Sequence, residues 1–172
     1  MEELNKNEYA SYFQGYIDLA IEKNHDFHQS LLLSLKDSIN FFNTIPVDKH
    51  LFRYADNKWT IKEILQHIID TERILSYRAL RFSRGDKTNI PGYDDNKYAE
   101  NSFANYRDFE NLINEFIEVR KSTIYLFKSF QSETLKNIGI AGDNNVSVRA
   151  LGYIISGHLL HHIRIIEQLY LQ

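Results

Sequence analysis

The sequence predicts an all-α protein, a four-helix bundle with one long crossing loop between its second and third helices. Seven glycines and two prolines in 172 residues leave long stretches without a helix breaker. In those stretches apolar residues recur three and four positions apart, as they do along one face of an α-helix. The chain is 43% hydrophobic and 13% aromatic, which is enough to bury one sizeable core. We therefore expect a single domain over residues 1–172.

End signals delimit the first two predicted helices. The first runs from about residue 26 to 43 and ends ahead of a proline, since the position before proline disfavours helical backbone. The second begins at Thr60, where the letters TIKE have the form of a capping box. In that motif the Thr60 hydroxyl accepts the backbone N–H of Glu63, whose carboxylate accepts the N–H of Thr60. This helix extends to about Arg84.

The segment GDKTNIPGYDDNKYAENS, residues 85–102, is rich in Gly, Pro, Asn and Asp. Such a composition is typical of a loop, and a loop of this length is a candidate wall for a pocket. The third predicted helix covers about residues 105–130, and the letters GIAGDNN supply the next turn. The fourth helix is expected to begin near Ser147.

Two histidines lie on the buried stripe of the fourth predicted helix. The segment SGHLLHHIRIIEQLY places His158 and His162 among apolar residues at helical spacing. Because they are four positions apart, their rings lie one turn above each other and can converge on a single ion. His161 is rotated by about 100° from His162 and does not easily join them. The apolar members of the stripe are Leu151, Ile155, Leu159, Ile166 and Leu169.

The second predicted helix carries a third inward histidine, His67, on a stripe with Ile64, Thr71 and Ile74. Each unsatisfied imidazole in a core costs about 1 to 3 kcal/mol. One metal ion would satisfy all three rings at once. The residues leave two alternatives open, a hydrogen-bonded histidine cluster and rings that are partly exposed. With no cysteine in the chain, any metal is held by histidines and carboxylates.

Charge and hydropathy exclude other classes of partner. The net charge is −3, and Lys and Arg are interspersed with Asp and Glu, so no nucleic-acid-binding face is expected. No run of 18 apolar residues and no signal-like N-terminal segment are present. We therefore expect no membrane partner and a cytoplasmic location.

Three segments carry a family resemblance: KWTIKEILQHIIDTERILSYRALRFSRGD, IPGYDDNKY and SVRALGYIISGHLLHHIRIIEQLY, in that order. They resemble the DinB-like four-helix bundle family, also called the YfiT-like or bacillithiol-transferase group. The resemblance implies one divalent metal ion held by His67, His158 and His162. Zn or Ni is the expected metal, with Fe a further candidate. The resemblance also implies a homodimer.

The resemblance further implies a metal-dependent enzyme. Its expected reaction is transfer of a low-molecular-weight thiol to a small electrophile, or hydrolysis of a small substrate, by a metal-activated thiol or water. Because the chain has no cysteine, the sulfur would come with the co-substrate. The alternative is a non-catalytic metal-binding protein with a structural or stress-related role.

Four charged residues of the second helix are candidates for the rest of the site. Glu63 and Asp70 lie four before and three after His67, where a carboxylate can orient the ring or move a proton. Arg78 and Arg81 are candidates for binding a substrate carboxylate. Competing interpretations are the capping box for Glu63, an ion pair for Asp70 and a solvated surface for both arginines.

Aromatic residues near the N-terminus are expected to be structural. Trp59, just before the Thr60 cap, is predicted to be a hydrophobic staple residue. A helical-looking aromatic segment is predicted to pack across the bundle rather than to bind a ligand. Its members are Tyr9, Tyr12, Phe13 and Tyr16.

Overall fold

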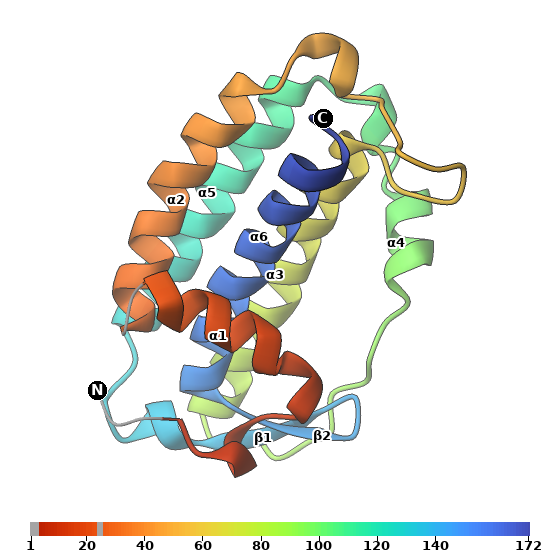
Figure 1. Cartoon of the computed structure of the whole chain (residues 1–172). Coiled ribbons are helices and arrows are strands. Elements are labelled where there is room, and N and C mark those ends of the chain that lie inside the picture. The colour runs from red at the N-terminus through yellow and green to blue at the C-terminus, as the bar shows by residue number, and fades with distance from the viewer. Residues whose placement is uncertain (1–3, 24–25) are drawn as a thin grey trace.

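In a computed structural model that describes residues 4–23 and 26–172, four long helices form the bundle (Figure 1). Helices α2 and α3 each pack against both α5 and α6. The prediction of an all-α four-helix bundle is thereby confirmed. No helix in the described residues is long and apolar enough to cross a membrane. The bundle helices are α2 (Phe27–Thr44), α3 (Ile61–Ser83), α5 (Phe109–Lys128) and α6 (Val148–Leu169).

Side-chain caps fix the starts of α3 and α6. The predicted capping box is present at α3: Thr60 Oγ1 accepts the Glu63 N–H at 3.1 Å, and Glu63 Oε2 accepts the Thr60 N–H at 2.7 Å. At α6, Ser147 Oγ accepts the Ala150 N–H at 3.1 Å. Because a cap sets the first residue of a helix, it also sets which side chains face the core further along.

Helix α1 (Gln14–Lys23) lies across α6 and was not predicted as a separate element (Figure 1). The backbones approach very closely at Gly157, where an added Cβ would lie 1.7 Å from the carbonyl oxygen of Tyr16. Only glycine permits this contact. The crossing therefore brings α1 directly against the turn of α6 that carries His158.

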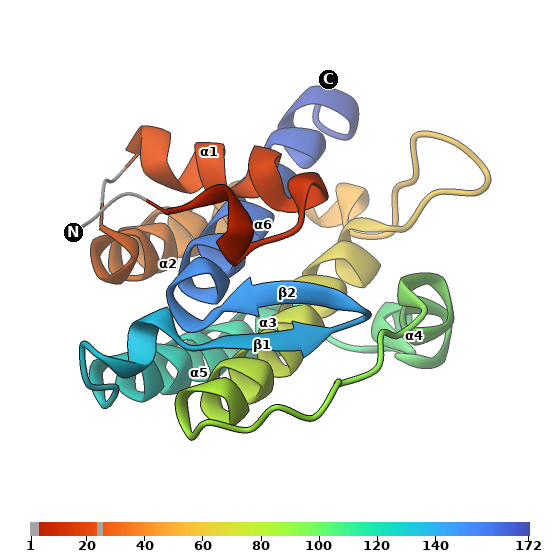
Figure 2. The same cartoon turned by 90° about the horizontal axis from the view of Figure 1, so that it is seen from below.

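A hairpin stands where the sequence predicted only a turn. Strands β1 (Ile138–Ala141) and β2 (Asn144–Ser147) pair antiparallel. Between them Gly142 and Asp143 have φ values of 57° and 63°, and positive φ at both central residues characterises the type I′ turn that favours two-residue hairpins. Viewed from below, the hairpin covers one end of the bundle (Figure 2).

The predicted crossing loop is held in place by contacts with the hairpin and with α3. Ile90 donates to the carbonyl of Ile140 and accepts from the N–H of Gly142, both at 2.9 Å. The loop then forms a short helix, α4 (Asp95–Asn101), which packs against α3. This path holds residues of the loop beside the inward stripe of α3.

A buried ion pair ties three helices together. Arg120 of α5 is 0% exposed and donates from Nε and Nη2 to the two carboxylate oxygens of Glu72, each at 2.8 Å. Its Nη1 donates to Ser34 Oγ of α2 at 2.6 Å. The guanidinium thus joins α2, α3 and α5 inside the core.

We predict that Glu72→Gln lowers the free energy of unfolding by about 3 to 5 kcal/mol, because it leaves the buried Arg120 charge without its counterion. Urea denaturation monitored by circular dichroism measures the change. Glu118→Gln is the matched control, since Glu118 pairs with Lys121 on the exposed face of α5 and should contribute less than about 1 kcal/mol. Equal effects of the two substitutions would contradict the role of the buried pair.

Candidate metal centre

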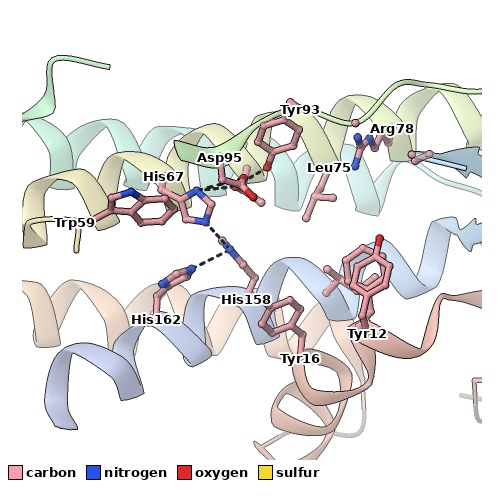
Figure 3. Close-up of a pocket in the computed structure, with 16 residues that line it drawn as sticks. Tyr12, Tyr16, Trp59, His67, Leu75, Arg78, Tyr93, Asp95, His158 and His162 are labelled. Carbon is pink, nitrogen blue, oxygen red and sulfur yellow. Dashed lines mark hydrogen bonds and ion pairs between the residues drawn. The ribbon is translucent and has the colours of Figure 1, made fainter. Parts of the chain in front are cut away.

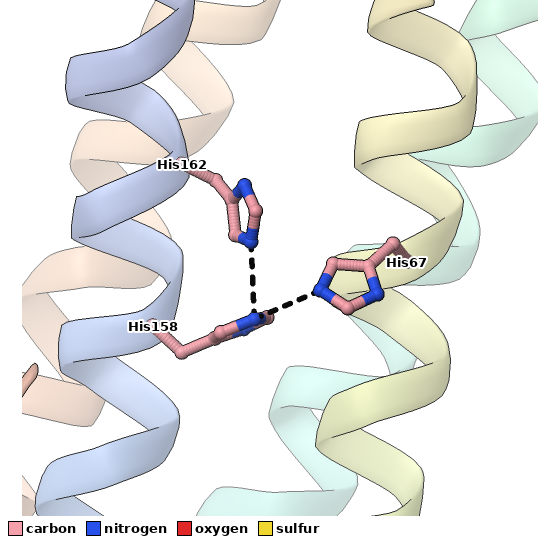
Figure 4. Close-up of side chains that lie close together, drawn as sticks. All are labelled: His67, His158 and His162. Atoms are coloured by element: carbon pink, nitrogen blue, oxygen red, sulfur yellow. Dashed lines mark hydrogen bonds between the residues drawn. The ribbon is translucent and has the colours of Figure 1, made fainter. Parts of the chain in front are cut away.

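Three histidines from two helices point toward one another (Figure 4). Nε2 of His158 lies 3.0 Å from Nε2 of His67 and 3.1 Å from Nε2 of His162. Within the described part of the chain these residues form the group that could hold a metal ion, with one ligand atom from each and all such atoms within 4.8 Å of one another. His161 is not a member, as its rotation about the helix predicts.

The arrangement fits a metal ion better than a hydrogen-bonded cluster. A ring nitrogen of a neutral imidazole carries either one proton or one lone pair, so it makes one well-aligned hydrogen bond. Nε2 of His158 faces two other ring nitrogens, and hydrogen bonds alone leave one of these contacts poorly satisfied. Three ligands about 2.1 Å from a tetrahedral ion lie about 3.4 Å apart, and the two contacts of His158 Nε2, at 3.0 and 3.1 Å, are within a few tenths of an ångström of that spacing.

Burial keeps the three rings neutral. His67 and His158 are 8% and 7% exposed. Burial lowers the pKa of His67 to about 4, against the opposing effect of Asp95. It also lowers the pKa of both His158 and His162 well below 6.5, and the neighbouring rings add to the effect. At neutral pH all three rings are therefore uncharged, and each can offer the lone pair of one nitrogen to a metal ion.

Two groups beside Nδ1 of His67 favour the tautomer in which Nε2 carries the lone pair that a metal ion needs. Its Nδ1 lies 3.7 Å from Oδ1 of Asp95 and 3.5 Å from Oγ1 of Thr71. A carboxylate beside Nδ1 favours a proton there and leaves the Nε2 lone pair free. The Trp59 ring lies against the same imidazole, with centroids 4.6 Å apart. No local sequence pattern links Asp95 to His67, and the carboxylate comes from the crossing loop.

The histidines line one end of a cavity of about 470 Å³ (Figure 3). Its walls come from the N-terminal segment, α3, the crossing loop and α6. The prediction that the crossing loop would form a pocket wall is confirmed. Among the other lining residues are Tyr12, Phe13, Tyr16, Trp59, Thr71, Leu75, Arg78, Gly92, Tyr93, Asp95 and Ile154.

The structure gives neither predicted catalytic carboxylate a place in this cavity. Glu63 is engaged by the Thr60 cap and accepts a hydrogen bond from Asn105 Nδ2 at 2.8 Å. Asp70 accepts a hydrogen bond from Gln66 at 2.9 Å and lies 3.7 Å from Arg73. Neither lines the pocket, because each sits on a flank of α3 rather than on its inward stripe.

The two predicted substrate-binding arginines have different positions. Arg78 is 8% exposed and lines the cavity. Arg81 does not line it, and its Nε donates to Asp86 Oδ2 at 2.6 Å in a local ion pair. The interpretation of Arg81 as a substrate ligand is therefore not supported by its position.

The N-terminal aromatic segment, predicted to pack across the bundle rather than to bind a ligand, also contributes three residues to the pocket wall. Tyr12, Phe13 and Tyr16 line the pocket, and the Tyr16 ring meets the His158 ring edge to face, with centroids 5.5 Å apart. Helical spacing indicated a common face for these residues. It carried no information on where α1 would cross α6.

Comparisons with known proteins agree with this fold. A model of the DinB superfamily matches residues 31–166, a span that includes all three histidines. The chain is structurally similar to YfiT from Bacillus subtilis, described as a probable metal-dependent hydrolase with an unusual four-helix bundle topology. The TM-score is 0.69 at 16% identity, covering 98% of this chain and 89% of that one. No curated protein matches by sequence.

We predict that His67→Ala, His158→Ala and His162→Ala each abolish stoichiometric binding of Zn²⁺ or Ni²⁺, because two imidazoles remain of a three-ligand set. Metal analysis after dialysis and isothermal titration calorimetry measure the loss. His161→Ala is the matched control on the same helix and should bind like wild type. Retained binding in all three ligand variants would contradict the assignment.

We also predict that acid destabilises the metal-free protein. The unfolded state takes up protons at these histidines near pH 6.5, whereas folded His67 does so only near pH 4. The free energy of unfolding should therefore be constant above about pH 6.5 and fall as the pH drops toward 4, on the order of 1 to 3 kcal/mol. Urea denaturation across this range measures it. His67→Leu should make the fall shallower by the share of this one histidine, and an unchanged profile would refute the cause.

Proposed function

The chain belongs to the DinB superfamily, and on that premise we propose that it is a divalent-metal-dependent enzyme that acts on a small molecule. The observation that carries this proposal is a set of three neutral histidines at one end of a cavity of about 470 Å³. Cavities of this size suit small-molecule ligands.

The donor set favours a catalytic role over a purely structural one. Structural zinc sites are normally closed by four protein ligands, whereas catalytic sites leave a position open. The described residues supply no fourth His, Asp or Glu to this group. An ion that merely joined α3 to α6 would not need a cavity beside it.

Zn or Ni is the proposed metal, with Fe a further candidate, since imidazole nitrogens suit all three. When bound, such an ion supplies a Lewis acid that lowers the pKa of a water or thiol and makes it a nucleophile at neutral pH. The remaining tasks of binding, orientation and proton transfer fall to side chains of this chain.

Asp95 and Tyr93 of the crossing loop are the side chains we propose for those tasks. Asp95 orients His67 from the Nδ1 side at 3.7 Å and, with its side chain 51% exposed, can exchange a proton with solvent. Burial raises the pKa of Tyr93 to about 12, so its hydroxyl stays protonated. The Tyr93 hydroxyl lies 2.9 Å from Thr71 Oγ1, and this contact holds it at the cavity wall as a hydrogen-bond donor for a substrate.

Hydrolysis is the first reaction we propose, in keeping with the description of YfiT as a probable metal-dependent hydrolase. Transfer of a low-molecular-weight thiol to a small electrophile is the second. The size of the cavity supports it, because about 470 Å³ leaves room for a small co-substrate beside the histidines. We also propose that the protein forms a homodimer and has a cytoplasmic location.

We predict that His158→Ala abolishes turnover by the metal-loaded protein and that Asp95→Asn lowers it about 10- to 100-fold through loss of ligand orientation. Asp70→Asn should act like wild type, because Asp70 lies outside the cavity. The assay follows small esters and amides, each with and without an added thiol and electrophile, with folding checked by circular dichroism. Equal rates for wild type and His158→Ala would contradict the enzyme proposal.

A further inference from the structure

Arg78 is a buried cation at the far end of the pocket from the histidines (Figure 3). It follows His67 by 11 residues on α3, which is about three helical turns, so both side chains leave the same face of the helix. The residue as a whole is 8% exposed and still lines the cavity. It therefore has a place in the pocket without being a solvated surface group.

The bonding of Arg78 inside the protein is incomplete. Its Nη2 donates to the carbonyl of Pro91 at 3.1 Å, while its buried Nε–H has no acceptor in the described part of the chain. Across residues 4–23 and 26–172 it forms no ion pair with a carboxylate. Two further arginines of the bundle helices, Arg120 and Arg149, are also strongly buried, and each has a carboxylate partner, Glu72 and Glu8 respectively.

An unpaired guanidinium in this position is costly. Moving a charge out of water costs several kcal/mol unless a counterion and hydrogen bonds replace the solvent. The aromatic ring of Tyr93, 6.0 Å from the guanidinium carbon, compensates only weakly at that distance. Burial indeed lowers the pKa of Arg78. The geometry calls for an anion from outside the chain.

We propose that Arg78 binds a carboxylate at one end of the ligand while the other end lies at the histidines. Only the placement of the other end at the histidines rests on the proposed function. A carboxylate is the matching anion, because Nε and a terminal nitrogen of one guanidinium form a fork that meets two oxygens.

The space between the two ends specifies the rest of the ligand. The Cα atoms of His67 and Arg78 lie about 16 Å apart along α3. Between them the wall carries Leu75 of α3 and Ile154 of α6. The ligand is therefore elongated, on the order of 10 Å from end to end after the side chains reach inward, and its middle is apolar except where it faces the hydroxyls of Thr71 and Tyr93.

The first test uses the metal-free, full-length protein, so that it does not depend on the proposed function. Straight-chain carboxylates from butanoate to decanoate are titrated by calorimetry against alcohols of equal length. We expect wild type to bind the best carboxylate about 10- to 100-fold more tightly than the matching alcohol. Arg78→Gln should lose this preference, and Arg78→Lys should keep part of it, because the charge remains without the fork.

Arg81→Gln is the matched control, one turn further along α3 and outside the cavity, and it should keep the full preference. Folding of every variant is checked by circular dichroism. The inference is overturned by equal affinity for carboxylate and alcohol in wild type, or by a preference that survives Arg78→Gln.

The second test loads the protein with Co²⁺ and adds mercaptocarboxylates of increasing length. A thiolate-to-cobalt absorption band that appears at lower concentration than with mercaptoalcohols, and only when Arg78 is present, supports a ligand held at both ends. Carboxylate preference in the first test without any cobalt band would retain the Arg78 site and reject the metal-dependent function. A cobalt band without carboxylate preference would reject the Arg78 site alone.

Discussion

The rest of the structure depends on the position of α3, and the buried pair between Glu72 and Arg120 holds that position. Glu72 projects from α3 toward α5, and Arg120 continues the connection to Ser34 of α2. The neighbouring Thr71, rotated by about 100° around α3, lies in the wall of the cavity. One turn of this helix thus carries both the buried ion pair and a pocket residue.

A second buried pair fixes the N-terminal segment in the same manner. Burial alone would raise the pKa of Glu8, but hydrogen bonds from Arg149, Asn5 and Ser147 outweigh it and lower the pKa to about 2. The carboxylate is thereby held at the start of α6. Together with the close approach at Gly157, this contact determines where α1 crosses the bundle. This crossing places the edge of the Tyr16 ring beside His158.

Sequence reasoning succeeded where a local pattern carries the information. The cap at Thr60, the helical period and the i, i+4 spacing of His158 and His162 are all contained within a few turns of chain. Sequence reasoning failed where the partner is distant in sequence. Asp95 lies beside His67 because hydrogen bonds of Ile90 hold the crossing loop against the hairpin. Leu169, expected on the buried stripe, is 46% exposed, because it stands in the last turn of α6.

One missed feature did leave a signal in the sequence. Arg120 continues the apolar stripe of Phe116 and Phe127 at helical spacing, where a solvated charge has no place. An inward arginine on such a stripe predicts a buried carboxylate partner, but its sequence position cannot say which acidic residue supplies it. Glu72 is 48 positions away, and the tertiary packing alone brings the two together.

The crossing of α1 over α6 divides the pocket between two stretches of the chain. The match to the DinB superfamily begins at residue 31 and contains the histidines, whereas Tyr12, Phe13 and Tyr16 precede it and form the facing wall. The three histidines and this wall of the pocket are consequently encoded in separate segments of the chain. Exchanging the aromatic residues that precede α2 would thus change the shape of one wall while leaving the three histidines, which lie on α3 and α6, in place.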